Sequence, residues 1–307
     1  MRKTVFVSKI ILIVVIMLSL IFGIIMPQYS TGYTASLGDK FDRLRSIDEP
    51  KIVLVGDSSV VFGFDSEKIQ EAFNMPVVNF GFSIDLGQPF HTEMIKANIN
   101  EGDIIVLAPA RFNDETTAIL DPILAWVSIE NNFRMWSGIS PENRIDMILA
   151  FPTYLRRAIA LFISGEGNLP DYGPYSRAQI NVYGDSKYPR PKDGDVEWQF
   201  GYGHLFDDNQ ISPAMKAYWN EFNEFVISRN ARLFITGPPI LENALSVDLM
   251  PLQTQLDEGL NFPMISNLED YVYPFEYFFD QNFHLNDFGV EVRTDQFIQD
   301  LKFALNS

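Results

Sequence analysis

The chain begins with an apolar run that is long enough to cross a membrane. Ile10–Met26 holds no charged residue, and Val5–Val7 extend the run toward the N-terminus. A helix needs about 20 apolar residues to cross the hydrocarbon of a bilayer. We therefore expect residues 1–27 to be a cytoplasmic N-terminus followed by a signal-anchor helix. Pro27–Tyr29 lack the small residues of a typical cleavage site, but a cleaved signal is still an alternative.

The basic residues of this region predict its orientation. Arg2, Lys3 and Lys9 lie at its start, and the next basic residue is Lys40. Because basic residues favour the cytoplasmic side of a membrane helix, we expect a single-pass cell-membrane protein. Its N-terminus would be cytoplasmic and its globular part extracytoplasmic.

Short apolar segments alternate with helical patterns in the rest of the chain. Four segments are rich in β-branched residues and are flanked by turn residues, which is typical of strands buried on both faces: 52–55, 75–80, 103–108 and 231–236. Helix starts are expected at Asp65, near Pro89, at Ser212–Pro213 and at Asn286 or Asp287. This order predicts an α/β domain over 50–307, with a parallel sheet and helices on both faces.

Two regions depart from this alternation. Residues 28–49 are polar and weakly patterned, and we interpret them as a stalk. Residues 115–210 predict an insertion over the carboxyl edge of the sheet, with helices at about 117–136 and 141–163. The second helix is apolar, but Arg156 and Arg157 would each cost about 2.5–3.5 kcal/mol inside a bilayer, which argues against a second span.

Composition excludes several classes of function. The chain has 40 acidic and 23 basic residues, a formal charge of −17, and no cysteine. An acidic surface repels phosphate backbones and anionic lipid headgroups, so nucleic acid is not an expected partner. Without cysteine there is no disulfide, no thiolate nucleophile and no Cys-ligated zinc. We expect no cofactor and no metal site, and we interpret Asp193–Asp195 as a solvated turn.

Candidate chemistry follows two of the predicted strands and precedes the last helix. Ser58 comes directly after the first strand, beside a helix start whose N–H groups can stabilise an oxyanion. Asn79–Gly81 follow the second strand, and glycine there allows close approach of a substrate and offers another N–H donor. His284 lies just before the last helix, where it can act as the base for Ser58, and Asp280 is the nearest carboxylate to orient it.

These residues resemble the SGNH (GDSL-like) hydrolase superfamily. Gly56–Asp57–Ser58 match its first block, Gly81 its second, and Asp280 with His284 its last, although Asp280 lies four residues before the histidine instead of the usual three. The family's third block supplies an oxyanion-hole asparagine, for which Asn113 is available. The resemblance covers 50–115 and 230–305, and implies a flavodoxin-like fold.

Other residues of the same kinds have simpler interpretations. A second Gly-Asp-Ser, Gly184–Ser186, has no buried strand before it, so we expect an ordinary loop turn. His91 and His204 are expected to be structural. Aromatic residues crowd the insertion and would either pack it onto its own domain or form a platform for sugar rings: Tyr172, Tyr175, Tyr183, Tyr188, Trp198, Phe200 and Tyr202.

The residues and the resemblance together predict an extracytoplasmic serine esterase or O-acyltransferase. Its substrates would be acyl esters of a cell-surface polysaccharide or related polymer, and a transferase would work with a membrane protein that supplies acyl groups. The alternative is a catalytically silent scaffold or glycan-binding protein of an envelope biosynthesis complex. That alternative rests on the displaced Asp280 and on Asn113, which the sequence does not align firmly with the asparagine of the family's third block.

Overall fold

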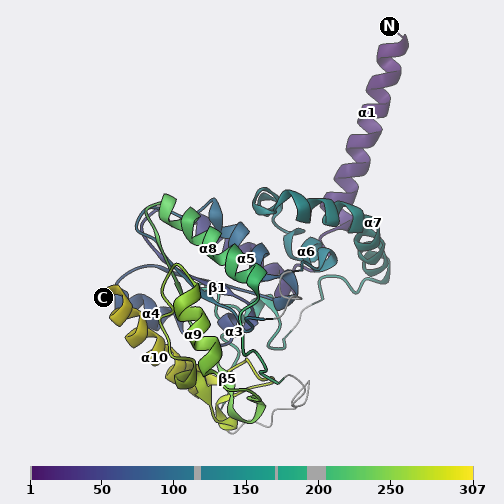
Figure 1. Cartoon of the computed structure of the whole chain (residues 1–307). Coiled ribbons are helices and arrows are strands. Elements are labelled where there is room, and N and C mark those ends of the chain that lie inside the picture. Colours follow the sequence, from purple (N-terminus) through teal and green to yellow (C-terminus); the bar gives the residue numbers. More distant parts are fainter. Residues whose placement is uncertain (1, 114–118, 170–171, 192–204, 307) are drawn as a thin grey trace.

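A parallel four-stranded sheet forms the centre of the protein in the computed structural model, which describes residues 2–113, 119–169, 172–191 and 205–306 (Figure 1). The strands are β1 (Ile52–Gly56), β2 (Val77–Gly81), β3 (Ile104–Ala108) and β4 (Arg232–Ile235), in the order β2-β1-β3-β4. All four predicted strands and their parallel arrangement are confirmed. The strand order reverses between β1 and β3, and ligands of open α/β sheets bind at such a point.

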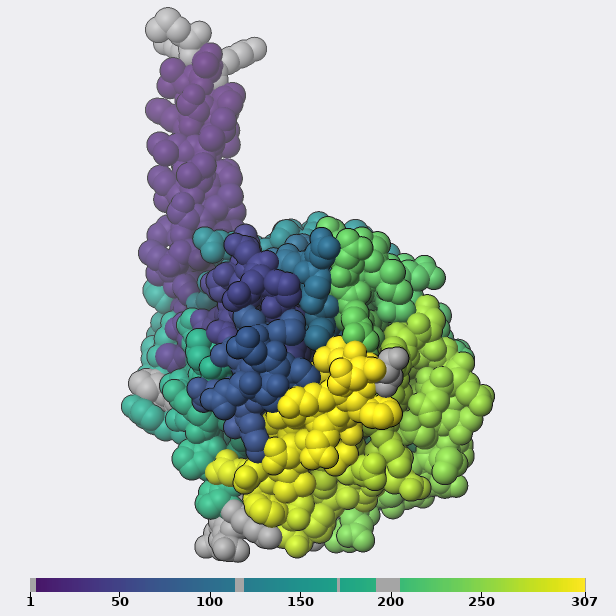
Figure 2. Space-filling model, turned by 90° about the vertical axis from the view of Figure 1, so that its left-hand side faces the viewer, coloured from purple at the N-terminus to yellow at the C-terminus, as the bar shows by residue number. Residues whose placement is uncertain are grey.

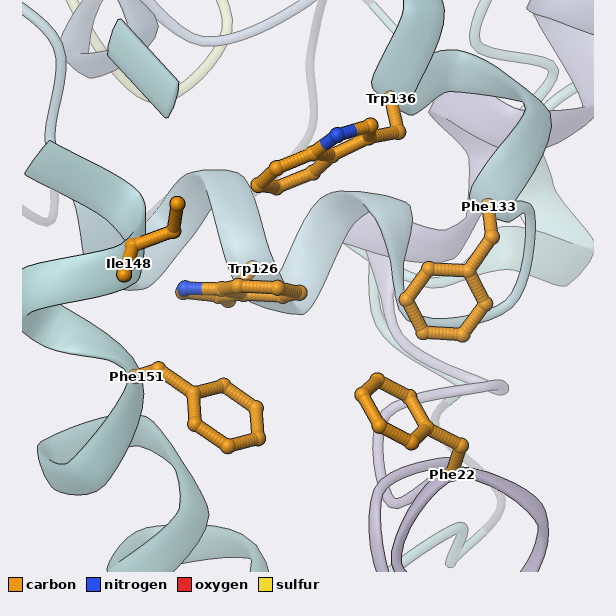
Figure 3. Close-up of a pocket in the computed structure, with 6 residues that line it drawn as sticks. All are labelled: Phe22, Trp126, Phe133, Trp136, Ile148 and Phe151. Atoms are coloured by element: carbon orange, nitrogen blue, oxygen red, sulfur yellow. The ribbon is translucent and has the colours of Figure 1, made fainter. Parts of the chain in front are cut away.

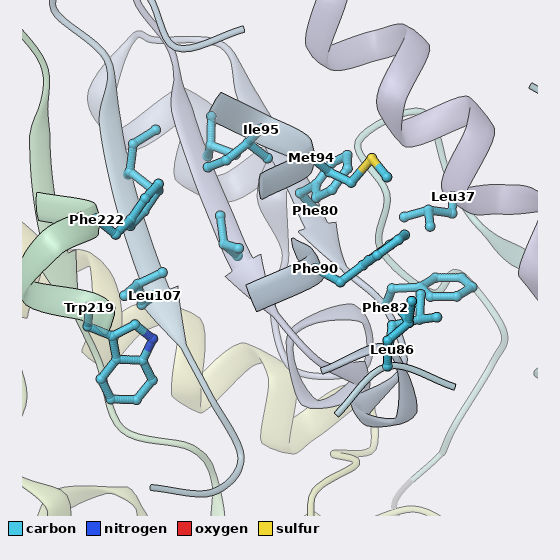
Figure 4. Close-up of a cluster of buried hydrophobic side chains, with 14 of the residues drawn as sticks. Leu37, Phe80, Phe82, Leu86, Phe90, Met94, Ile95, Leu107, Trp219 and Phe222 are labelled. Atoms are coloured by element: carbon cyan, nitrogen blue, oxygen red, sulfur yellow. The ribbon is translucent and has the colours of Figure 1, made fainter. Parts of the chain in front are cut away.

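Helices cover both faces of the sheet, as the sequence predicts. Alternate residues of each strand join different clusters, so that Val53 and Val55 pack on one side and Ile52 and Leu54 on the other. The first side carries α2 (Ser36–Ser46), α5 (Gln88–Lys96) and α8 (Pro213–Ser228), and Figure 4 shows part of this cluster. The second side carries α4 (Ser66–Phe73) and α10 (Asp287–Asn306).

The segment interpreted as a stalk is part of the domain instead. Residues 33–46 form η2 (Tyr33–Ala35) and α2, which packs against β2. Leu37, Phe41 and Leu44 are buried there at helical spacing. The many charged residues of this short helix hide its apolar stripe, because they lower the average hydrophobicity that suggested a stalk.

The insertion contains a shorter helix than expected, followed by the long one. Asp121 caps α6 (Pro122–Ile129), which is followed by η5 (Phe133–Gly138). Ser140 caps α7 (Pro141–Ser164), close to the predicted bounds. The remaining elements are α3 (Ser58–Val61), η3 (Ile84–Leu86), η6 (Arg177–Gln179), β5 (Ile240–Leu241), η7 (Glu242–Ala244), α9 (Met250–Gly259), η8 (Leu268–Tyr271), β6 (Val272–Tyr273) and η9 (Phe275–Tyr277).

The N-terminal helix projects away from the body of the protein (Figures 1 and 2). It consists of α1 (Arg2–Leu20) and η1 (Ile21–Ile25), and its apolar part, Thr4–Ile25, is long enough to cross a membrane and is not buried by the rest of the chain. By length and composition α7 passes the same test.

Candidate active site

Ser58 lies where β1 ends and α3 begins, at the carboxyl edge of the sheet. The preceding Asp57 caps α3, since its Oδ1 accepts a hydrogen bond from the Ser59 N–H at 2.9 Å. Its Oδ2 accepts one from the Ala110 N–H at 2.7 Å. Because Ala110 follows β3, this buried carboxylate ties the ends of β1 and β3 together and holds Ser58 beside the point where the strand order reverses.

Folding brings the three predicted catalytic residues into one hydrogen-bonded chain. Ser58 Oγ lies 2.8 Å from His284 Nε2, and His284 Nδ1 lies 2.9 Å from Asp280 Oδ1. A turn sets the spacing of the last pair, because the His284 N–H donates to the Gln281 carbonyl and the Phe279 N–H to the His284 carbonyl. Asp280 therefore reaches the imidazole from four residues away.

The imidazole is held in place on its face as well as at its edges. His284 is fully buried, and its ring stacks on Phe62 with 4.2 Å between ring centroids. The Gln281 side-chain amide nitrogen lies 2.8 Å from Nε2 and 2.9 Å from Nδ1. The residue at the usual aspartate position thus contacts the imidazole without replacing Asp280.

Tyr175 is a site residue that the sequence did not single out from the other aromatic residues. Its hydroxyl donates a hydrogen bond to Asp280 Oδ2 and lies 3.2 Å from His284 Nδ1. Burial and the neighbouring Asp280 raise the pKa of Tyr175, so it remains a donor. In the sequence, Tyr175 is only one of the aromatic residues that would pack the insertion or bind sugar rings.

The carboxyl of Asp280 is kept ionised by its partners. Burial by itself would raise the pKa of Asp280, but the hydrogen bond and attraction of His284 and the hydrogen bond from Tyr175 outweigh it. The net result is a pKa below the usual value. An ionised carboxylate at Nδ1 favours the tautomer that leaves Nε2 free to accept a proton from Ser58.

Ser58 and His284 open into a pocket of about 430 Å³. Its wall combines residues from η2, from the start of α3, from the segment after β2, from the insertion and from the turn before α10: Tyr33, Thr34, Ser58, Phe82, Ser83, Ile84, Asp85, Leu124, Tyr175, Gln281 and His284. The volume is within the range of small-molecule sites. The cluster of a serine, a histidine and a carboxylate at one end of it can carry out nucleophilic chemistry.

Asn79 and Gly81, predicted to bind the oxyanion or substrate, lie behind this pocket instead of lining it. The Gly81 N–H donates to Asn79 Oδ1 at 3.0 Å, and the Asn79 amide donates to the Val60 carbonyl and to Asp185. A Cβ on Gly81 would lie 2.5 Å from the Val60 Cβ. Gly81 is therefore required for close packing of β2 on α3, and its N–H is already used.

Asn113 also lies outside the pocket of Ser58. It lines a different hollow, with Arg111, Asp207 and Asp208, and its N–H lies 3.4 Å from Asp208 Oδ2. The chain after β3 is held there because Asp208 also accepts from the Phe112 N–H at 2.6 Å. The predicted oxyanion role of Asn113 is not supported by this position.

Two buried arginines fix the segments that carry Ser58 and His284. Arg190 donates to the carbonyls of Phe62 and Leu285 at 3.0 and 2.8 Å. Arg293, on α10, donates to the Ser59 carbonyl at 2.9 Å, and burial lowers its pKa to about 10. Neither arginine belongs to a sequence motif, and these carbonyl partners are distant in the chain, so nothing in the sequence alone indicates this supporting role.

The remaining candidates divide into two groups. His91 is fully buried on α5, where burial lowers its pKa to about 3, which fits the structural role expected of it. Asp193–Asp195, His204 and the aromatic residues at 198, 200 and 202 lie outside the described residues. Within the described ranges, no group of three or more histidine and acidic residues lies close enough together to hold a metal ion.

Comparison with known proteins does not identify a family. No protein-family model, no curated protein and no solved structure matches the chain.

Proposed function

We propose that the protein is an extracytoplasmic serine esterase or O-acyltransferase of the SGNH type. It would act on acyl esters of a cell-surface polysaccharide or a related polymer. The observation that carries this proposal is the hydrogen-bonded chain from Ser58 through His284 to Asp280, which joins the start of the sheet to the end of the domain. It opens into a pocket with room for a small acyl group and part of a sugar.

The first half of the reaction transfers the acyl group to the protein. Ser58 Oγ attacks the ester carbonyl carbon while His284 Nε2 takes its proton, and Asp280 stabilises the imidazolium that forms. The N–H groups of Ser58, Ser83 and Ile84 are the donors that we propose for the oxyanion, because these three residues line the same pocket. Collapse of this intermediate breaks the ester bond, and the leaving alcohol receives the proton from His284.

The second half releases the acyl group from Ser58. His284 takes a proton from the acceptor, whose oxygen attacks the acyl carbon. Collapse of this second intermediate breaks the bond between Ser58 Oγ and the acyl carbon, and His284 returns the proton to Ser58 Oγ. The acceptor is water in an esterase and a sugar hydroxyl in a transferase. In the transferase, a membrane protein that carries acyl groups across the bilayer would supply the donor.

A serine-directed fluorophosphonate probe tests this proposal on the full chain. We expect covalent labelling of Ser58 in the wild type, and none in Ser58→Ala or His284→Gln, since both the nucleophile and its base are needed. Ser186→Ala is the matched control and should label fully. Mass spectrometry of acyl adducts on Ser58, after incubation with candidate donors, then identifies the acyl group.

A catalytically silent scaffold is the second candidate. It is favoured by the positions of Gly81 and Asn113, because neither contributes the donor to the pocket that an SGNH enzyme would use. The two functions differ in the probe experiment. A properly folded wild type that takes up no probe at Ser58 would exclude the enzyme and leave the scaffold.

The proposed location rests on α1. It would anchor the protein as a single-pass membrane protein, with Lys3 in the cytoplasm and the domain outside. Because the chain has no cysteine, a single introduced cysteine shows on which side of the membrane its position lies. Glu67→Cys, at an exposed position, should react with a membrane-impermeant maleimide on intact cells, whereas Lys3→Cys should react only after lysis. The reverse pattern would place the domain in the cytoplasm.

A further inference from the structure

A second pocket, of about 350 Å³, lies where the N-terminal helix meets the domain (Figure 3). Its wall is entirely apolar or aromatic: Phe22, Trp126, Phe133, Trp136, Ile148 and Phe151. The rings contact one another around the hollow, with centroids 5.4 Å apart for Phe22 and Phe133 and 5.1 Å apart for Trp126 and Phe151. The Trp126 indole N–H is not available to a ligand in the pocket, because it donates a hydrogen bond to the Met147 carbonyl.

One wall of this pocket comes from the helix that is apolar enough to cross a membrane. Phe22 belongs to Thr4–Ile25, a segment in which no residue is fully buried, and the Phe22 ring contacts Phe133 and Phe151 of the domain. The other walls come from α6, η5 and α7, and α7 contacts η1 directly. The pocket therefore lies beside the end of the segment that a bilayer would surround.

The outward face of α7 is also apolar, which is unusual for a helix facing water. Met147, Tyr154 and Ala158 face the domain and are buried. On the opposite side, Leu149 is 74% exposed and Ile163 is 77% exposed. Arg156 lies on this same side, seven residues from both Leu149 and Ile163, and Arg157 follows it. Helices that lie in a membrane interface combine apolar residues with such basic residues, whose long side chains reach the headgroups.

We propose that the pocket binds a hydrocarbon chain of a lipid from the bilayer that α1 crosses. The proposal rests on the membrane anchoring proposed above and is independent of the chemistry of Ser58. A hydrocarbon chain fits this wall because it needs no hydrogen-bond partner. An extended peptide would bury backbone N–H and C=O groups that six apolar side chains cannot pair. The apolar face of α7 would keep the mouth of the pocket at the level of the lipid.

The experiment uses the full chain in phosphatidylcholine vesicles that contain a phospholipid with a photoreactive diazirine near the end of one chain. After illumination, mass spectrometry locates the adducts. We expect adducts on the lipid-facing side of α1 and also on Trp126 or Phe151. Trp126 is only 6% exposed, so a chain must enter the pocket to reach it.

A pair of neighbouring substitutions provides the control. Ile148→Phe fills the pocket and should lower labelling of Trp126 several-fold while α1 stays labelled. Leu149→Phe adds the same bulk on the outward face and should leave both unchanged; both positions are largely exposed, so folding should tolerate either change. Labelling of α1 without Trp126 or Phe151 would overturn the proposal in favour of an empty pocket or one covered by another protein. If α1 is unlabelled as well, the membrane anchoring fails and this proposal fails with it.

Discussion

The tripeptide Gly-Asp-Ser occurs twice in the chain, and the serines of its two copies lie in opposite environments. In the first, Asp57 accepts two backbone hydrogen bonds, and Ser58 points to His284 in an open pocket. In the second, Asp185 is buried and accepts hydrogen bonds from the Ser66 N–H, the Ser66 hydroxyl and the side chain of Asn79. The hydroxyl of Ser186 is buried and has no partner within the described residues.

The second copy supports the first. The Ser186 N–H donates to the Val61 carbonyl at 2.9 Å, and Asn79, held by Asp185, donates to the Val60 carbonyl. Both carbonyls belong to α3, the short helix that begins at Ser58. The same three residue types thus present a nucleophile when they end a strand beside a histidine, and brace the main chain when they lie in a buried turn.

The largest difference between the copies should be in activity. We expect Ser58→Ala to lower turnover of an activated ester such as p-nitrophenyl acetate by a factor on the order of 10⁶, as removal of a serine nucleophile does. Ser186→Ala removes the same atom from the other copy and should retain wild-type turnover. Equal losses in the two variants, with folding unchanged by circular dichroism, would end the distinction between them.

The next effect concerns the imidazole and carboxylate that only the first copy has. Asp280→Asn should lower turnover by roughly 10⁴, because an amide at Nδ1 favours the wrong tautomer of His284. Circular dichroism should show an unchanged fold. Asp207→Asn, at an exposed carboxylate away from Ser58, is the control and should have little effect. Turnover of Asp280→Asn near the wild-type rate would mean that another group orients His284.

The second copy should contribute to stability through Asp185. Asp185→Ala leaves several buried donors without an acceptor, at about 1–3 kcal/mol each. We expect a fall in the free energy of unfolding of about 3 kcal/mol or more, measured by guanidinium denaturation in detergent. Asp39→Ala, which removes an exposed ion pair with Arg177, should cost about 1 kcal/mol or less. If the two variants were equally stable, Asp185 would not be a brace.

These contrasts show which parts of the site the sequence could reveal. A continuous apolar segment followed by a polar turn predicts a buried strand whose carboxyl end carries the polar residues. Ser58 and the turn before α10 could therefore be predicted to lie at the same edge of the sheet. That topology predicts that the two segments meet, whereas the 2.8 Å between Ser58 Oγ and His284 Nε2 comes from the structure. Asp280 could be named because it is near His284 in the chain.

Other parts depend on contacts between distant segments and leave no local signal. Tyr175 resembles its neighbouring tyrosines until folding places it on Asp280. The Gly81 N–H was predicted to face a substrate, but its direction depends on the side chain of Asn79. Asn113 follows the expected strand, yet Asp208 holds that loop in a separate hollow. The partners of Tyr175 and Phe112 lie about 100 residues away in the sequence, and Asn79, although only two residues from Gly81, is itself held by the equally distant Asp185.

The smallest expected effect concerns the buried amine of Lys40, which is attracted by the carboxylate of Asp185 in the second copy. Its Nζ donates to the Gly81 carbonyl at 2.6 Å. Burial lowers the pKa of Lys40 to about 7, although Asp185 opposes this. The unfolded chain keeps an ordinary lysine pKa of about 10.4, so between these values the unfolded state binds the extra proton and stability rises with pH.

One proton gives a slope of at most about 1.4 kcal/mol per pH unit, and this slope should disappear below about pH 7, where both states are protonated. Guanidinium denaturation of the wild type at pH 7, 8 and 9 should therefore show rising stability. Lys40→Met removes the titrating group and should flatten the rise. In Asp185→Asn the attraction is lost, so the pKa of Lys40 should fall further and the rise should begin at lower pH. A slope that Lys40→Met leaves intact would show that Lys40 stays charged over this pH range. The Gly81 carbonyl would then accept its hydrogen bond from an ammonium ion and not from a neutral amine.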